Sequence, residues 1–315
     1  MNIAIDLMGG DFAPLEAVKG VGLFLTRPRP GITLTLIGDK AQIELLLSEH
    51  GINNENISIV HSAQVIEMHE HPTRALKEKK QSSIAIGFQL LATGETDAFI
   101  SAGNTGAMMV GALYSIKAIE GVLRPSIGAY LPRENGNLAL LLDVGLNADC
   151  KPENLSQFAV LGSLFAKHIL NIPNPRVGLL NLGAEEGKGN LLTQAAYPLL
   201  KENKRINFIG NVEGRDLLPD NADIYVCDGF TGNAILKFAE SIYDIVQSRN
   251  IVDEYFNRFN FEIYGGVPVL GVNKPVIIGH GISHALAFDN MIELAKKMQD
   301  ESLIDKIKTA FVNQG

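Results

Sequence analysis

Short apolar runs alternate with amphipathic stretches along the whole chain. The apolar runs predict strands at residues 3–8, 34–37, 57–60, 98–101, 138–144, 177–182, 224–227 and 276–278. The amphipathic stretches predict helices at residues 14–25, 41–49, 84–92, 107–119, 152–169 and 283–297. Because several runs are apolar throughout instead of alternating, we expect an α/β fold with a largely parallel sheet and helices on both faces.

One type of junction recurs between these elements. An apolar strand runs into a loop rich in glycine and asparagine, and the loop opens a helix, in the strings SAGNTGAMM, LLNLGAEEGKGN, CDGFTGN and IIGHGISHA. No low-complexity linker and no repeat of fixed period divides the chain. We therefore expect one domain over residues 1–315.

The four junctions predict an anion site. At the carboxyl edge of a parallel sheet, such loops direct backbone N–H groups and helix N-termini at a common crevice, which suits a phosphate or carboxylate. A single loop of this kind is explained by turn geometry alone, but four together favour a ligand. None has the GxGxxG spacing, since Gly20 and Gly22 lie inside a predicted helix. A nicotinamide cofactor is therefore not expected.

Three side chains at these junctions are candidates for chemistry. Lys188 stands between two glycines, where its ammonium either lies beside a bound phosphate or is a solvated loop charge. His280, also between glycines, either donates to an oxyanion or holds a turn, and the turn is favoured. Cys227 ends a predicted strand, and a buried thiol is favoured there over a nucleophile.

Composition narrows the classes of protein. Hydrophobic residues make up 46% of the 315 positions and charged residues 20%, as is usual for a globular chain. Cys150 and Cys227 have no neighbouring cysteine, so a reducing compartment is expected. No histidine pair has metal-ligand spacing on a helix, and His69 and His71 flank Glu70 in a polar run. No metal is expected.

Charge and hydropathy restrict the partners. The net charge of −8 disfavours nucleic acid and anionic lipid, because the long-range field has the wrong sign. No stretch approaches the roughly 20 apolar residues that span a bilayer. The first run, IAIDLM, lacks the features of a secretory signal. A cytoplasmic protein is expected.

Long strings along the chain identify a family. In order, IAIDLMGGDFAP, SAGNTGAMM, RPSIGAYLP, LLLDVGLNADCKPE, NPRVGLLNLGAEEGKGN, FIGNVEGRDLL, CDGFTGNAILK and YGGVPVLGV resemble bacterial phosphate acyltransferases of phospholipid synthesis. The resemblance implies a three-layer α/β/α sandwich of the isocitrate and isopropylmalate dehydrogenase and phosphotransacetylase type, and a homodimer. It also implies transfer of a fatty acyl group from acyl carrier protein to inorganic phosphate, giving acyl phosphate for phosphatidic acid synthesis, without a cofactor.

The chemistry that the resemblance implies agrees with the candidate residues. Phosphate brings its own nucleophilic oxygen, and the thioester leaves as a thiolate with a pKa of about 8.5. The reaction therefore needs an anion cradle, a positive charge and donors for the developing oxyanion. We expect Lys188 to hold phosphate and His280 to be the oxyanion donor or proton carrier. Expected substrate-binding residues, by position in the matching strings, are Asp6, Gly9, Gly10, Asn104, Thr105, Gly106, Gly189, Asn190, Gly232 and Asn233.

A basic run offers a docking surface for the carrier protein. Cations gather in HPTRALKEKK as Arg74, Lys77, Lys79 and Lys80. Acyl carrier proteins are acidic, so such a patch would steer them despite the unfavourable net charge. The alternative is a solvated helix face.

The chain departs from the family pattern between GNAILK and YGG. The family usually carries there a longer helical pair with an exposed apolar tip that helps the dimer sit on the membrane. Here the segment is short, and apolar residues at steps of three and four predict two short amphipathic helices, a dimerisation segment around 234–262. Acidic residues outnumber the two arginines in this segment. We therefore expect weak or transient contact at the inner face of the membrane.

Other functions stay open. A phosphotransacetylase-like enzyme acting on short acyl-CoA would use the same scaffold. A noncatalytic phosphate-binding module would bind phosphate without turnover. A β-decarboxylating dehydrogenase is disfavoured, because it needs acidic metal ligands and a nicotinamide site that the sequence does not show.

Overall fold

The computed structural model describes residues 1–53 and 55–312, which form two compact units. The first unit joins Met1–Lys117 to Phe261–Asp300. The second joins Ala118–Asn260 to the C-terminal residues from Glu301 on. That the two units act together as one acyltransferase domain stays a prediction.

The first unit is built on a sheet in the order β3-β2-β1-β4-β11-β10. Its strands are β1 (Asn2–Asp6), β2 (Thr33–Gly38), β3 (Ile57–His61), β4 (Ala98–Ser101), β10 (Val267–Leu270) and β11 (Val276–Ile278). All neighbours in this sheet are parallel except β10, which is antiparallel to β11. The central strands are buried on both faces, as Ile3, Ala4 and Ile5 show, which explains why their sequences are continuously apolar.

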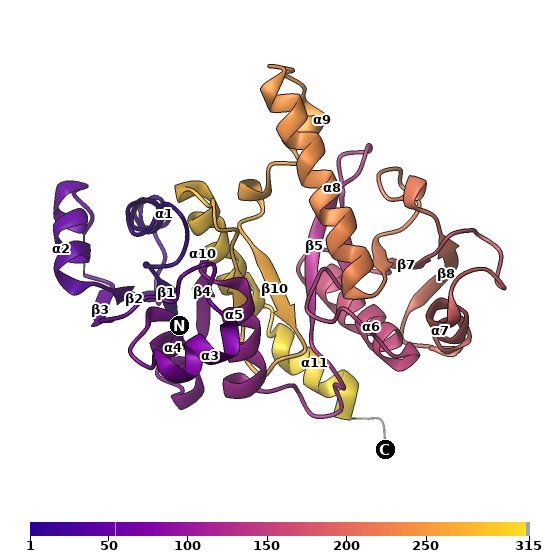
Figure 1. Cartoon of the computed structure of the whole chain (residues 1–315), viewed down its shortest axis with the longest axis horizontal. Helices are drawn as coiled ribbons and strands as arrows, with labels where there is room; N and C mark the ends of the chain where they lie inside the picture. The colour runs from indigo at the N-terminus through magenta and orange to yellow at the C-terminus, as the bar shows by residue number, and fades with distance from the viewer. Residues whose placement is uncertain (54, 313–315) are drawn as a thin grey trace. The chain divides into compact units, whose positions relative to one another are not determined.

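Helices cover both faces of the first sheet. They are α1 (Leu15–Leu25), α2 (Lys40–Glu49), α3 (Pro72–Glu78), α4 (Ser83–Thr93), α5 (Thr105–Gly111) with its π-helical continuation Ala112–Ile116, α10 (Ala285–Asp300) and the 3-10 turn Phe261–Ile263. Figure 1 shows α1 and α2 on one side of the sheet and α3, α4 and α5 on the other. Gly20 brings α1 against α10, because a Cβ there would lie 2.4 Å from the Cβ of Phe288. This glycine therefore serves helix packing.

The strands of the second unit follow the order β5-β6-β9-β7-β8. Its strands are β5 (Ser126–Pro132), β6 (Leu138–Leu142), β7 (Arg176–Leu180), β8 (Asn207–Val212) and β9 (Ile224–Val226). Only β5 is antiparallel to its neighbour β6. Its helices are α6 (Pro152–His168), α7 (Leu191–Glu202), α8 (Gly229–Ser248), α9 (Glu254–Asn257), α11 (Leu303–Val312) and the 3-10 turn Gly214–Asp216.

A buried helix organises the second unit. α6 packs on β6 and β9, and α7 and α11 pack on α6. Gly162 allows the close approach, since a Cβ there would lie 2.4 Å from Leu142 Cδ1. α8 contacts β6 through its first turns instead.

The predicted α/β class with a largely parallel sheet is confirmed. Three strands were not predicted from the sequence, namely β5, β8 and β10. β5 carries Gly128 and Pro132, and β8 contains Gly210 at a φ of +102° beside a register shift, so neither reads as a regular apolar run. The 234–262 segment also differs from expectation. It holds most of the 20-residue helix α8 and the single turn α9 instead of two short helices.

No helix within residues 1–53 and 55–312 is long and apolar enough to cross a membrane.

Candidate active site

In the first unit, a buried carboxylate lies beneath the glycine loops. β1 ends at Asp6 and the neighbouring parallel strand β4 ends at Ser101, so both ends meet at one edge of the sheet. Ser101 Oγ donates to Asp6 Oδ2 over 2.7 Å, and the Met8 amide donates to Asp6 Oδ1 over 2.9 Å. Burial raises the pKa of Asp6, and these hydrogen bonds oppose that rise. Asp6 has no exposed surface, and its oxygens hold the loop above it. Its expected role toward the substrate stays a prediction.

Gly9 and Gly10 form the tight loop above this carboxylate. A Cβ on Gly9 would lie 2.5 Å from Asp6 Oδ2 and 2.6 Å from the Gly103 nitrogen, so no larger residue fits. Gly10 has a φ of +103°, which favours glycine. The next amide, that of Asp11, donates to the Gly281 carbonyl over 2.7 Å. The loops that follow β1, β4 and β11 are thereby joined at one edge.

Asn104 is an organising residue of this edge. Its Nδ2 donates to the carbonyls of Glu67, Met68 and Glu70, at 2.9, 3.2 and 3.0 Å. Its Oδ1 accepts from the Ala107 amide at the start of α5 over 2.9 Å. The side chain is therefore fully engaged within the protein and 3% exposed. It fixes the 67–70 loop onto the helix N-terminus.

The open donors at this edge are the groups that follow Asn104. Thr105 is exposed, and Gly106 lies so close to Pro72 that a Cβ would be 2.3 Å from its Cγ. The amides of Thr105 and Gly106 are in the first turn of α5, where they have no intrahelical acceptor. They are suited to an anionic oxygen.

His280 follows β11 and is half-buried. Its ring lies against that of Phe261, with centroids 4.9 Å apart. Its Nδ1 accepts from the Ile282 amide over 3.4 Å, and its carbonyl accepts from Ser283. These contacts agree with the turn-holding interpretation, and its role toward an oxyanion stays a prediction.

The basic run is only partly available to a partner. Arg74 pairs with Glu78 at 2.9 Å, and Lys79 pairs with Glu70 at 2.6 Å. That hydrogen bond with Lys79 holds the pKa of Glu70 below its usual range and ties α3 to the loop that Asn104 binds. The remaining two cations, Lys77 and Lys80, are exposed and make no ion pair within the described residues. α3 also packs against α5.

The second unit repeats the buried carboxylate at Asp143, directly after β6. Its Oδ1 accepts from the Ile127 amide over 2.9 Å, and its Oδ2 accepts from the Asn147 amide over 2.6 Å. Burial raises the pKa of Asp143, against the effect of these bonds. The first turn of α8 lies on this residue. A Cβ on Gly232 would be 1.9 Å from the Asp143 carbonyl oxygen, and one on Gly229 2.7 Å from its Oδ2.

The neighbouring Asn233 is exposed and makes no hydrogen bond within the part of the chain that the structure describes. It lies beside Gly145, at which a Cβ would be 3.6 Å from its Oδ1. Asp228 caps the same helix, because its Oδ1 accepts from the Thr231 amide over 2.9 Å. The start of α8 is therefore ordered and has an open amide side chain.

Neither cysteine has the environment of a nucleophile. Cys227 is 2% exposed, and burial raises its pKa well above the ordinary value. Burial, with the nearby charge of Asp143, also raises the pKa of Cys150 to about 11. Because the thiolate is the reactive form, these environments disfavour a nucleophilic role for both cysteines. The buried-thiol interpretation of Cys227 agrees with this geometry.

Lys188 lies in the loop between β7 and α7. Asn181 Nδ2 donates to its carbonyl over 3.0 Å, and its own amide donates to the Glu185 carbonyl over 3.1 Å. The side chain is exposed, and its ammonium has no hydrogen bond or ion pair with any residue of 1–53 and 55–312. The nearby carboxylate of Glu186 pairs with Lys201 at 2.9 Å instead. A full positive charge is left open to a ligand.

The residues after Lys188 start a helix. Gly189 has a φ of +110°, and a Cβ there would lie 2.0 Å from Thr193 Oγ1. Asn190 is the N-cap of α7, since its Oδ1 accepts from the Thr193 amide over 2.9 Å. β7 and β9 are parallel neighbours, so the Lys188 loop and the start of α8 leave the same edge of the second sheet. A lysine, a helix N-terminus and exposed amides at one edge can hold a phosphate.

The sequence analysis missed several residues that hold these loops, above all Ser101, Asp143, Asn147 and Asn181. A signal for Asp143 was present, because IDLMGG and LDVGLN both place an aspartate at the end of an apolar strand before glycine. No group of three or more His, Cys, Asp and Glu side chains that could hold a metal occurs in the described residues.

Comparison with known proteins identifies the family. A family model described as "Fatty acid synthesis protein" matches residues 1–306. A phosphate acyltransferase from Thermoanaerobacterium thermosaccharolyticum is 43% identical, with 98% of this chain and 96% of the relative covered. One from Aquifex aeolicus is 46% identical, with 94% of this chain and 92% of the relative covered.

Solved structures share the fold at low identity. A phosphotransacetylase from Streptococcus pyogenes matches with a TM-score of 0.63 at 20% identity, covering 95% of this chain and 94% of that one. A branched-chain phosphotransacylase from Enterococcus faecalis matches with a TM-score of 0.60 at 14% identity, covering 94% and 98%. The predicted fold of the phosphotransacetylase type is confirmed.

Proposed function

The chain belongs to the phosphate acyltransferase family, and on that premise we propose that it transfers a fatty acyl group from acyl carrier protein to inorganic phosphate. The products are acyl phosphate, used for phosphatidic acid synthesis, and the free carrier thiol. The observation that carries this proposal is the exposed ammonium of Lys188, which lies in a glycine loop at a helix N-terminus and has no partner among the described residues.

The reaction needs no protein nucleophile. A phosphate oxygen attacks the thioester carbonyl, the C–O bond forms, and the C–S bond then breaks as the thiolate leaves and takes up a proton. Lys188 would hold phosphate and neutralise part of its charge, with Gly189, Asn190 and Asn233 beside it. In the first unit, the open amides of Thr105 and Gly106, and the ring of His280, would donate to a substrate oxygen.

Asp6, Gly9, Gly10, Asn104 and Gly232 have supporting roles in this proposal. Their contacts shape the loops and are made within the protein. For Asn104 this changes the expected role, because its Nδ2 already donates to three carbonyls. We propose that it positions the donors of α5 and does not itself bind substrate.

For the carrier protein, we propose docking on the exposed cations of the basic run. Lys77 and Lys80 are the side chains without a local acidic partner in the described chain. Arg74 adds charge that Glu78 partly offsets, and Lys79 mainly holds the 67–70 loop. An acidic carrier would be attracted to this local patch despite the net charge of −8.

We also propose a cytoplasmic homodimer with weak or transient contact at the inner face of the membrane. The support is the apolar surface of the 234–262 segment, since Phe238 is 68% exposed, Ile245 55% and Val252 91%. An exposed apolar stripe of this size is typical of an interface. The acidic residues of the segment disfavour tight binding to anionic lipid.

The shared fold keeps one alternative function in view, a phosphotransacetylase-like enzyme that uses short acyl-CoA. In the deciding experiment, purified protein is incubated with phosphate and either palmitoyl-acyl carrier protein or acetyl-CoA. Chelator is present, no nucleotide is added, and any acyl phosphate that forms is trapped with hydroxylamine. We expect product from the carrier protein. Product from acetyl-CoA alone would establish the alternative, and phosphate binding without any product would indicate a noncatalytic module.

A further inference from the structure

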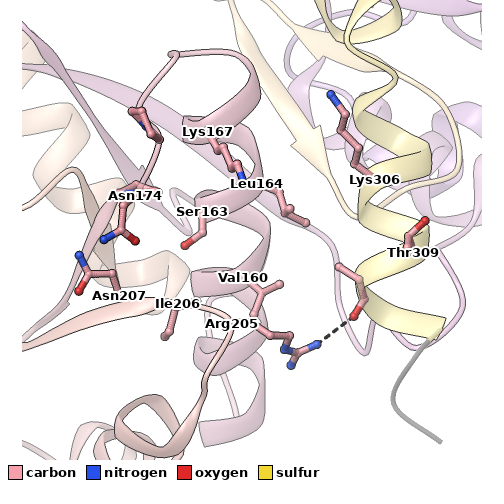
Figure 2. A pocket seen from close by; sticks show the side chains of 13 residues that line it. Val160, Ser163, Leu164, Lys167, Asn174, Arg205, Ile206, Asn207, Lys306 and Thr309 are labelled. Carbon is pink, nitrogen blue, oxygen red and sulfur yellow. Dashed lines mark hydrogen bonds between the residues drawn. The ribbon is translucent and has the colours of Figure 1, made fainter.

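The second unit contains a cavity of about 610 Å³ that the proposed reaction does not use. It lies between α6, the turn 173–175 before β7, residues 205–207 at the start of β8, and α11 (Figure 2). Its size is within the range of small-molecule sites. Its walls precede β7 and β8, whereas the Lys188 loop follows β7, so a strand of five residues, about 16 Å, separates the two. The cavity is therefore distinct from the Lys188 loop.

Cations line this cavity. Lys167, Arg205 and Lys306 contribute to its wall, and none of the described residues that line it is acidic. Arg205 is held in place, because its Nη1 donates to the Ala310 carbonyl over 3.0 Å. Lys167 is exposed and makes no ion pair within residues 1–53 and 55–312. The cavity has a positive field that nothing in its own wall offsets.

The cations of the cavity also affect a neighbouring histidine, His168. His168 Nδ1 lies 3.0 Å from Lys306 Nζ, which also pairs with Glu301 at 3.3 Å. Burial lowers the pKa of His168, and the charges of Lys306 and Lys167 lower it further, against a smaller opposite effect of Glu301.

A buried hydroxyl in the wall lacks a partner. Ser163 is 9% exposed, and its Oγ makes no hydrogen bond within the described residues. Figure 2 shows this hydroxyl on the side of α6 that faces Asn174 and Asn207. A buried hydroxyl without a partner is unfavourable, and a ligand oxygen would satisfy it.

The wall also contains the apolar side chains of Val160, Leu164 and Ile206, beside the polar Asn174, Asn207 and Thr309. We propose that this cavity binds a small amphipathic anion, a phosphate or carboxylate head on a short apolar chain. The head accepts from Ser163 Oγ and from the ammonium and guanidinium groups of Lys167 and Arg205. The apolar chain lies against Val160, Leu164 and Ile206. The proposal does not depend on the reaction proposed above.

The test follows His168 by NMR in histidine-labelled protein, with its ring signal assigned from His168→Gln. Octyl phosphate and octanoate are titrated in turn, and octanol and inorganic phosphate serve as the matched neutral tail and bare head. We expect a saturable shift with one or both octyl anions, at least tenfold tighter than with octanol or phosphate. The two anions distinguish a phosphate from a carboxylate head. No saturable shift with either anion, or equal affinity for octanol, would overturn the proposal.

Three variants test whether the cavity itself, and not the general positive charge of this surface, binds the octyl anions. Lys167→Ala should weaken octyl anion binding about tenfold, as is usual for a lost charged hydrogen bond. Ser163→Ala should weaken binding while leaving the melting temperature unchanged or raised, because it removes a hydroxyl with no partner. Lys204→Ala is the control, since Lys204 is exposed next to Arg205 but does not line the cavity. A loss as large in Lys204→Ala as in Lys167→Ala would contradict the proposal.

Discussion

The two units use the same device at the carboxyl edge of their sheets, but with different chemical results. In each, a buried aspartate, Asp6 or Asp143, lies at or just after the end of a strand, and its oxygens accept hydrogen bonds from a neighbouring strand and from the loop that follows. In the first unit the loops end in neutral donors at the start of α5. In the second unit the loops carry the open ammonium of Lys188. The first unit therefore offers neutral hydrogen-bond donors at its sheet edge, and the second offers a positive charge at its own.

The two buried aspartates differ in whether their hydrogen-bond partners could adapt to an asparagine in their place. Each oxygen of Asp143 accepts from a backbone amide, which cannot reverse its role, and Oδ1 also accepts from Ser126 Oγ over 3.3 Å. One oxygen of Asp6 accepts from the hydroxyl of Ser101, which can also act as an acceptor. The carboxylate of Asp143 is therefore more strictly required than that of Asp6.

The largest expected effect on stability is at the contact between α8 and Asp143. Gly232→Ala should lower the free energy of unfolding by about 3 kcal/mol or more, because its Cβ would overlap the Asp143 carbonyl oxygen, 1.9 Å away. Chemical denaturation measures this change. The control Gly214→Ala has open space around its Cβ and should change stability by only a few tenths of a kcal/mol. Equal effects would show that α8 can shift freely on the sheet.

Exchanging each aspartate for asparagine sharpens the comparison further. Asp143→Asn should cost about 1–3 kcal/mol, since one amide N–H must face a backbone N–H. Asp6→Asn should cost clearly less, because Ser101 Oγ can accept from the new amide. Both are measured by denaturation at pH 7. A greater cost for Asp6→Asn would reverse the ranking of the two carboxylates.

Carrier-protein docking belongs to the first unit in this account. The double change Lys77→Glu and Lys80→Glu should raise the KM for acyl carrier protein about tenfold and raise the KM for acyl-CoA far less, because only the carrier protein would dock on the patch. Arg74→Glu should act more weakly, since Glu78 already offsets its charge. Equal increases in KM for both donors would rule out docking on this run.

The smallest expected effect concerns α8, the helix that carries the exposed apolar stripe. Purified protein should float only weakly with anionic liposomes, because the acidic 234–262 segment is repelled by an anionic surface. Flotation at low and high salt measures this. Tight, salt-resistant binding would show that the apolar side chains anchor the protein despite those charges.

Much of this site could be predicted from local sequence, because a glycine loop after an apolar strand is a local feature. All eight predicted strands exist, and each of the four junctions follows a strand and lies at a sheet edge. The role of Asn104 could not be predicted. Its three acceptors come from the 67–70 loop, which only the tertiary fold brings to α5. The same holds for Gly232, whose close contact with Asp143 joins residues far apart in sequence.

The central claim is that Lys188 supplies the positive charge for the reaction. Its most direct test is the kcat of Lys188→Ala at saturating phosphate and acyl carrier protein. Removing an electrostatic contact that is strengthened in the transition state commonly costs about a hundredfold or more in kcat. The fold should be unaffected, because the ammonium has no partner among the described residues. We predict a hundredfold loss of acyl phosphate formation, with an unchanged melting temperature and partial rescue in Lys188→Arg. Near-normal turnover in Lys188→Ala would contradict the account.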